Sequence, residues 1–206
     1  MDFARHFKLA ELAEGFRGEL LNDHTLLLLA HKEARVGDVR ALAGKRITIL
    51  SGDDLSEVYL ETLCLRHYQR PCKQVFSSIE SVTNSNQLMM KLFFRKTDLV
   101  LSKLNGYETA RELNPQIGLT TQEVTRFPLK SSYYGLYNRN ISPDFRQRSL
   151  KQVPGMHKEA RGLQVLEVFK LDRLVIASEQ ELQPVYALLA DYEALRARSG
   201  KTGRGP

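Results

Sequence analysis

Two hydrophobic patterns alternate along the chain. Short apolar runs, such as residues 25–31 and the β-branched residues 45–50, are typical of buried strands. Between such runs, residues 51–66 repeat apolar side chains at i, i+3 and i+4, which is typical of a helix packed on a sheet. Over the whole chain, the patterns predict strands at residues 25–31, 45–50, 73–79, 98–102, 117–127 and 131–137. They predict helices at residues 51–66, from 84 onward, 106–113, 142–153 and 178–197. Residues 36–43 are expected to form a short helix or turn, and residues 162–167 a strand or a short helix.

Strands that alternate with helices through short connections pair in parallel, because each helix carries the chain back across the sheet. The predicted fold class is therefore α/β, with doubly wound parallel sheets and helices on both faces. Ligands of such sheets bind beyond the carboxyl ends of the strands. Polar residues lie at three of these ends, and the candidate ligand-binding residues there are Ser51, Gly52, Ser81, Thr83, Asn84 and Ser102.

Two of these strand ends lead into helix starts, whose free N–H groups suit an anion or a carbonyl-bearing ligand. Ser51, with Asp54 three residues later, approximates a capping box, and Asn84 is a good cap for the next helix. Capping alone accounts for both residues, and the carboxylates of Asp53 and Asp54 would repel an anion. The pattern therefore leaves two interpretations open, a ligand site and a pair of ordinary helix starts.

The composition is that of a globular protein, with 42% hydrophobic and 26% charged residues in a chain of 206. Apolar runs stay far below the roughly 20 residues that a membrane-spanning helix needs, and the first 16 residues lack the pattern of a secretory signal. The formal net charge of +6 is concentrated in residues 196–206, which hold four bases and no acid. We expect this Gly-rich basic tail to be disordered, and we expect neither a nucleic-acid partner nor a membrane span.

Residues with catalytic or metal-binding chemistry are sparse. The sequence contains no Gly-rich phosphate loop, no GxSxG motif and no HExxH motif, and its five histidines lack metal-ligand spacing. It therefore predicts no catalytic residues, no metal site, no cofactor and no enzyme activity. Cys64 lies in a predicted helix and Cys72 opens the predicted strand after Pro71, so the two are either buried thiols or a disulfide.

Several motifs follow one another in a recognisable order. They are the segment LAGKRI at residues 42–47, the polar turn Ser51-Gly52 before a long helix, the strand-to-helix turn at 81–86, and DLV at 98–100 followed by Tyr107. In this order and spacing, residues 39–107 resemble the middle of phosphate/phosphonate-type substrate-binding proteins of ABC transporters. A weaker likeness continues to about residue 195. The resemblance implies the type-2 periplasmic-binding-protein fold.

The resemblance implies two α/β lobes joined by two crossover strands, with a ligand held in the cleft between lobes that close on it. The crossovers would be residues 25–31 and 131–137, and Tyr133 or Tyr134 would reach the ligand from the hinge. The expected domains are a second lobe at 38–128, a partial first lobe built from 1–37 and 129–195, and the basic tail at 196–206.

Two departures from the family pattern accompany the resemblance. Members begin with a strand–helix–strand unit, whereas residues 1–15 resemble the helix that follows that unit. We therefore expect an N-terminally truncated relative, a misplaced start or a degenerate homologue, with an incomplete first lobe. The family's binding turn is rich in Ser and Thr, whereas here Asp53 and Asp54 stand among those positions beside Ser51 and Ser56.

The leading functional hypothesis is a solute-binding protein, or an orphan sensor relative, that captures a small polar or anionic ligand. An ABC transporter permease is the further partner that the resemblance implies. The location would be periplasmic if a leader precedes this chain, and cytoplasmic otherwise. The alternative is the effector-sensing domain of a transcription regulator, which would form a dimer. An enzyme of the same fold, for instance one making a thiamine pyrimidine, is less favoured because neither cysteine is expected at the carboxyl end of a strand.

Overall fold

The structure is a computed structural model of the chain. It describes residues 15–19, 25–128, 134–136, 141–168, 171–177 and 179–202. The chain divides into two compact units, Met1–Asp23 with Lys130–Gln183 and His24–Leu129 with Pro184–Pro206. The predicted second lobe, residues 38–128, falls within the second of these units, but so do residues 25–37 and 184–195, which were predicted in the first lobe. Residues 196–202 of the tail, predicted to be disordered, form the end of a helix.

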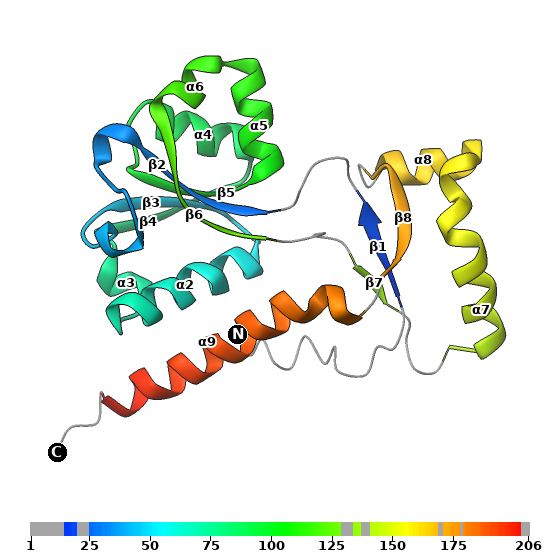
Figure 1. The fold of residues 1–206 in the computed structure, drawn as a ribbon. Coiled ribbons are helices and arrows are strands. Elements are labelled where there is room, and N and C mark those ends of the chain that lie inside the picture. Colours follow the sequence, from blue (N-terminus) through cyan, green and yellow to red (C-terminus); the bar gives the residue numbers. More distant parts are fainter. Residues whose placement is uncertain are drawn as a thin grey trace. The chain divides into compact units, whose positions relative to one another are not determined.

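The second unit contains a five-stranded sheet in the order β4-β3-β5-β2-β6 (Figure 1). The second strand in this order, β3, pairs in parallel with both β4 and β5, whereas β2 is antiparallel to β5 and to β6. Four strands therefore share one direction and one is reversed. The strands are β2 (Leu26–His31), β3 (Arg46–Leu50), β4 (Ser78–Val82), β5 (Leu99–Lys103) and β6 (Thr121–Phe127).

The reversed strand corrects the expectation of all-parallel pairing. A parallel neighbour needs a crossover connection, usually a helix that spans the sheet. The link from β2 to β3 contains only two short 3-10 helices, η2 (Lys32–Ala34) and η3 (Val39–Ala41). The chain consequently starts β3 at the same edge of the sheet where β2 ends, and β2 runs against its neighbours.

Helices cover both faces of this sheet, as predicted. In Figure 1, α4 (Ser85–Phe93), α5 (Leu104–Leu113) and α6 (Pro115–Thr120) lie on one face, and α2 (Asp54–Tyr68) and α3 (Cys72–Val75) lie on the other. Apolar side chains fill both layers because the predicted helical stripes point inward. On the α4 face the core contains Leu27, Leu29, Val82, Leu88, Met89, Leu92, Val100, Ala110 and Ile117.

The opposite face is closed mainly by α2. Val58, Tyr59 and Leu63 of this helix are buried, and the ring of Tyr59 lies 5.2 Å from that of Phe127 in β6. The helix α9 (Gln183–Thr202) belongs mostly to the same unit, and an ion pair between Arg66 and Asp191 joins it to α2. None of the helices in the described part of the chain combines the length and apolar content that crossing a bilayer requires.

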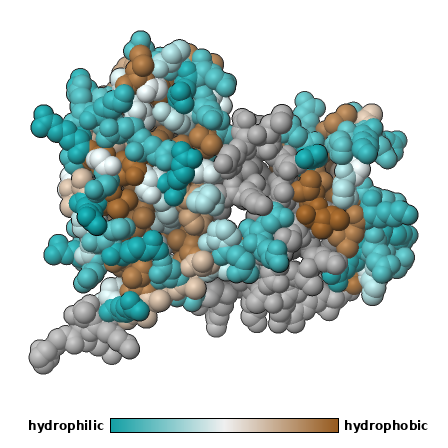
Figure 2. Space-filling view, in the orientation of Figure 1, coloured by the Kyte–Doolittle hydropathy of each residue, from teal (hydrophilic) through white to brown (hydrophobic). Residues whose placement is uncertain are grey.

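The first unit contains a three-stranded antiparallel sheet in the order β7-β1-β8. Its strands are β1 (Gly15–Glu19), β7 (Tyr134–Leu136) and β8 (Arg173–Ala177), and its helices are α7 (Pro143–Gln152), η4 (Val153–Lys158), α8 (Ala160–Val168) and η5 (Glu179–Leu182). Apolar surface is visible around β8 and α8 in Figure 2, where Val168 and Ile176 are 78% and 53% exposed.

Two predicted elements differ from the structure, and two strands in the structure were not predicted. Residues 72–75 form α3 rather than a strand, because Pro71 supplies a helix start and the N–H of Phe76 closes a turn onto the carbonyl of Cys72. Asn114-Pro115 ends α5 as predicted but also begins α6, so the strand β6 starts at Thr121 and not at residue 117. The strands β1 and β8 were not predicted.

Candidate functional site

The carboxyl ends of β3, β4 and β5 lie at one edge of the five-stranded sheet, because these three strands are parallel neighbours. Each strand is followed by a helix that begins at this edge: α2 after β3, α4 after β4 and α5 after β5. We call this region the carboxyl edge. The predicted residues Ser51, Gly52, Thr83 and Asn84 directly follow β3 and β4, whereas Ser81 and Ser102 are the second-last residues of β4 and β5.

The turn between β3 and α2 brings the first two strands together. Ser51 donates its backbone N–H to the carbonyl of Val82 at 2.9 Å, and its hydroxyl donates to the same oxygen at 3.3 Å. Gly52 follows with a φ of +76°, a left-handed conformation that glycine adopts without strain. The end of β3 is thereby fixed to the end of β4, with Ser51 exposed.

The helix α2 is capped by Asp53 and not by Ser51. The Asp53 carboxylate accepts a hydrogen bond from the N–H of Ser56 at 3.3 Å, which corrects the predicted capping box of Ser51 and Asp54. The other carboxylate oxygen lies 3.5 Å from Nζ of Lys103, at the end of β5. Because this lysine offsets the charge of Asp53, the acidic residues of the turn weigh less against an anion than the sequence alone suggests.

Asn84 caps α4, as predicted. Its side-chain oxygen accepts from the N–H of Gln87 at 2.8 Å, so the amide nitrogen is the group left to meet a ligand. Thr83 and Ser81 are exposed beside it. The capping role and a ligand role are compatible here, since they use different atoms of the same side chain.

Ser102 is only 1% exposed, and its hydroxyl donates to the carbonyl of Lys103 at 3.0 Å. Gly106, in the first turn of α5, allows this helix to lie close to Ser85 of α4 and to Ser102 of β5. A Cβ built on Gly106 would lie 3.0 Å from the hydroxyl of Ser85 and 3.4 Å from that of Ser102. Ser85, the first residue of α4, and Lys103 are therefore part of the carboxyl edge. Both residues belong to the polar strand ends that the sequence indicates, at 81–86 and 102–103, although neither is among the candidate ligand-binding residues predicted from it.

Two further predicted residues cannot be placed at this edge. Tyr133 lies outside the described residues. Tyr134 begins β7 in the first unit, where only its backbone is described, and it pairs with Arg17 of β1.

The electrostatics of the carboxyl edge favour a negatively charged ligand. A helix N-terminus carries partial positive charge, and its first N–H groups have no partner within the helix. Three such termini begin at this edge, and α5 starts at Lys103 without a side-chain cap. Lys103 and Asp53 offset each other's charge, so the positive potential comes from the helix starts, and the amide of Asn84 and the hydroxyl of Ser85 supply hydrogen-bond donors beside them.

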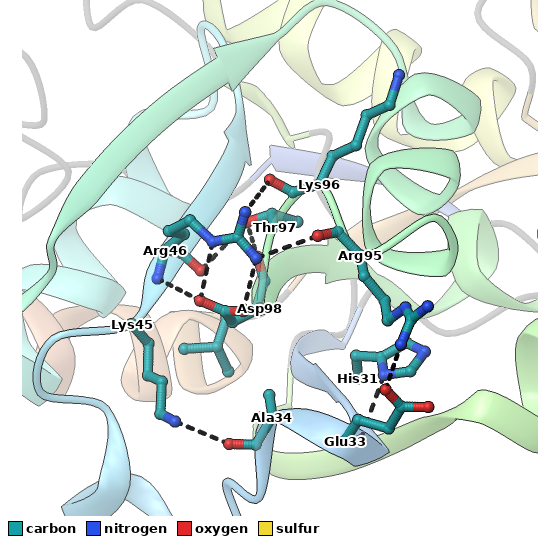
Figure 3. A network of polar contacts seen from close by, with 10 residues as sticks. His31, Glu33, Ala34, Lys45, Arg46, Arg95, Lys96, Thr97 and Asp98 are labelled. Carbon is teal, nitrogen blue, oxygen red and sulfur yellow. Dashed lines mark hydrogen bonds and ion pairs between the residues drawn. The ribbon is translucent and has the colours of Figure 1, made fainter.

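A second polar cluster lies at the opposite edge of the sheet, where β3 and β5 begin (Figure 3). Arg46 binds Asp98 through two side-chain contacts, Nε to Oδ2 at 3.2 Å and Nη2 to Oδ1 at 2.9 Å, and its backbone N–H donates to Oδ2 at 2.9 Å. The guanidinium also donates to the carbonyls of Arg95 and Lys96, at 3.1 Å each. We call this cluster the amino-edge network.

The amino-edge network surrounds a hollow of about 190 Å³. The hydrogen bond from Arg46 is the main reason that the pKa of Asp98 lies below its usual range, and the same bond raises the pKa of Arg46. Glu33 pairs with Arg95 across the hollow, and Nζ of Lys45 donates to the carbonyl of Ala34 at 2.8 Å. These charges are engaged with one another, so the network is best understood as a clamp on the ends of the strands.

Clusters of metal ligands do not occur among the residues that the structure describes: no three His, Cys, Asp or Glu side chains gather there as a cation site would require.

Comparison with known proteins gives matches in structure only. No protein-family model matches the chain, and no curated protein matches its sequence. A binding-protein component of an ABC phosphonate transporter from Pseudomonas aeruginosa superposes with a TM-score of 0.63 at 14% identity, covering 90% of this chain and 64% of its own length. The chain thus spans somewhat less than two thirds of that protein.

Two other solved proteins are similar over most of the chain. A Xanthomonas citri protein, solved once with chloride ion and once with ATP, gives a TM-score of 0.67 at 12% identity, covering 91% of this chain and 72% of its own. PhnD1 from Prochlorococcus marinus, in complex with methylphosphonate, gives 0.60 at 12% identity, with 86% and 69% covered. The chain has the type-2 periplasmic-binding-protein fold. The α/β class and the fold that the sequence resemblance implied are confirmed.

Proposed function

We propose that this chain is a solute-binding protein of an ABC transport system, or a sensor derived from one, and that it captures a small anionic ligand at the carboxyl edge. The observation that carries the proposal is the convergence of three helix N-termini with Lys103 at the ends of β3, β4 and β5. This arrangement offers positive potential and hydrogen-bond donors from three segments that are far apart in the sequence.

The ligands of the structural neighbours support an anion. The three proteins above are named for, or solved with, a phosphonate, chloride or ATP, all of which carry negative charge. Phosphonate and phosphate are compact and present several oxygen acceptors, which suits the amide of Asn84 and the hydroxyl of Ser85, and that of Ser51 once it turns from the carbonyl of Val82. Thr83 and Ser81, both exposed, would border such a ligand.

Lys103 is the residue with the largest expected role. Its ammonium lies 3.5 Å from the Asp53 carboxylate, longer than a close charge-assisted hydrogen bond, and its side chain is 29% exposed. A bound anion would compete with Asp53 for this ammonium. Ser102 is buried and bonded to the backbone, so it supports the edge rather than meeting the ligand directly.

A transport role implies a permease partner and a periplasmic location, and both are part of this proposal. The regulator alternative makes a different prediction, because an effector-sensing domain would form a dimer. Size-exclusion chromatography with light scattering separates the two: a monomer that binds an anion supports transport, whereas a ligand-responsive dimer supports regulation.

Calorimetric titration with methylphosphonate, inorganic phosphate and ATP tests the ligand class. We expect at least one of them to bind, and Lys103→Met to weaken that binding about tenfold or more through loss of a charged hydrogen bond. Lys73→Met is the matched control, since it removes the same charge from an exposed position on α3, near the start of β4. The proposal is wrong if none of the three anions binds, or if both variants bind as the unchanged protein does.

A further inference from the structure

The two cysteines of the chain lie against each other in the core of the second unit. Cys64 is in the third turn of α2 and Cys72 is the first residue of α3, and their sulfur atoms are 2.8 Å apart. A disulfide bond is about 2.05 Å long, so the two sulfurs need to approach by less than about 1 Å to bond. Both residues are buried, at 0% and 5% exposure.

We propose that Cys64 and Cys72 are a disulfide site, in which the two thiols of the reduced chain are joined by exchange with a small-molecule disulfide. The segment between them is already folded back on itself. The helix α2 ends at Gln69, which has a left-handed φ of 56° and donates its N–H to the carbonyl of Leu65. Pro71 then starts α3 directly beside the helix that the chain has just left.

A side-chain contact holds the second cysteine in place. The backbone N–H of Cys72 donates to Oε2 of Glu61, one turn before Cys64 on α2, at 3.0 Å. This bond fixes the start of α3 to the turn of α2 that precedes Cys64. The bond does not involve either sulfur atom, so forming a disulfide need not break it.

The exchange is balanced in atoms and electrons. The thiolate of one cysteine attacks a sulfur of the small disulfide, which forms a mixed disulfide and releases one small thiolate. The thiolate of the other cysteine then attacks the protein sulfur of that mixed disulfide and releases the second small thiolate. The chain loses two electrons and two protons, and the small disulfide is reduced to two thiols.

The first attack falls to Cys72, whose side of the pair borders the exposed residues Gln69, Arg70 and Lys73. Its contact with Cys64, its burial and the nearby Glu61 all raise the pKa of the Cys72 thiol. Because the thiolate is the reactive form, the bond should form slowly at neutral pH and faster as the pH rises. Burial also protects the finished bond from reductants, as expected of a bond that persists once formed.

Peptide mapping tests the proposal on the unmodified full-length chain. The reduced protein is incubated with excess oxidised glutathione at pH 8, denatured, alkylated and digested with trypsin. Trypsin cleaves after Arg66 but not between Arg70 and Pro71, so Cys64 and Cys72 fall in separate peptides, residues 47–66 and 67–73. We expect these two peptides to be joined, and the intact mass to lose two hydrogen atoms.

Three outcomes overturn the proposal: two cysteines that both alkylate after prolonged oxidation, a glutathione adduct that never resolves, and a disulfide-linked dimer on a non-reducing gel. Cys64→Ala and Cys72→Ala provide controls, since each should retain the adduct on the remaining cysteine. The joined form should also melt about 5 °C above the reduced form, because the bond restricts the unfolded chain. Equal melting midpoints would contradict a bond formed without strain.

Discussion

The two edges of the five-stranded sheet contain similar kinds of residue in opposite states. At the amino edge, Arg46 and Asp98 use nearly all of their hydrogen-bonding capacity on each other and on nearby backbone (Figure 3). At the carboxyl edge, Lys103 and Asp53 face each other at 3.5 Å, the hydroxyl of Ser51 makes only a 3.3 Å bond to the carbonyl of Val82, and the amide nitrogen of Asn84 is not used by its capping bond. Charge and polarity alone do not mark a site; the available donors distinguish the two edges.

This contrast has a topological cause. Strands β3 and β5 start at the amino edge shortly after turns, at residues 43–44 and 94–95, and the hydrogen bonds of Arg46 hold the second turn against the start of β3. Helices start at the carboxyl edge instead, and the N–H groups of their first turns cannot be satisfied within the helix. Caps satisfy some of these groups, such as the N–H of Ser56 and that of Gln87, and the helix starts still direct their positive potential to the carboxyl edge.

Removing donors from the carboxyl edge should produce the largest effect on ligand binding. The double change Ser51→Ala with Asn84→Ala should weaken anion binding by about 1–3 kcal/mol in total, through lost hydrogen bonds. Calorimetric titration measures the change. Since Asn84→Ala also removes the cap of α4, Asn84→Asp is the control. It keeps the capping oxygen and should preserve stability, yet it should still weaken anion binding. Unchanged affinity in the double variant would remove this edge from consideration.

Breaking the amino-edge network should instead affect stability. Asp98→Ala removes the acceptor for one backbone and two side-chain hydrogen bonds of Arg46, and should lower the free energy of unfolding by about 2 kcal/mol in urea. Anion affinity should not change. Glu33→Gln is the control, because Glu33 and Arg95 are 66% and 63% exposed and should contribute about 0.5 kcal/mol or less. Equal losses in the two variants would contradict the clamp.

The turn at the end of β3 should depend on the conformation of Gly52. Its φ of +76° strains any residue with a Cβ, so Gly52→Ala should cost about 1 kcal/mol of unfolding free energy. Gly37→Ala tests the same addition at a glycine with open space around its Cβ position and no positive φ, and should be neutral or slightly stabilising. Thermal unfolding measures both. A Gly52→Ala variant as stable as Gly37→Ala would show that the turn relaxes.

The sequence predicted the second unit well because its strands and helices have strong periodicity. The runs at 25–31 and 45–50, the Asn84 cap and the stripe of Leu88, Met89 and Leu92 all appear in the structure. The prediction was wrong where the same residues can either end one element or begin the next. Asn114-Pro115 both ends α5 and starts α6, and Pro71-Cys72 begins a helix where a strand was predicted.

The site was predictable only in part. Polar residues after β3 and β4 are local signals, and parallel pairing places them at one edge. The position of Lys103 beside Asp53, and of Gly106 against Ser85 and Ser102, depends on how α5 packs beside α4. The strand β1 of the first unit pairs with segments more than 100 residues away, and no local pattern specifies such pairing.

The pH dependence of stability should give the smallest difference between the two edges. Because Arg46 lowers the pKa of Asp98 in the folded chain, this carboxylate stabilises the fold at pH values above the unfolded value of about 4, and the contribution is lost as the pH falls through the folded pKa. Urea unfolding between pH 7 and pH 3 should therefore show a steeper loss for the unchanged protein than for Asp98→Asn. Half-exposure of Arg46 limits the effect, and salt should reduce it further. Parallel pH profiles for the two proteins would mean that the Arg46–Asp98 ion pair contributes nothing to the stability of the folded chain. The contrast between the edges would then depend on the carboxyl edge alone.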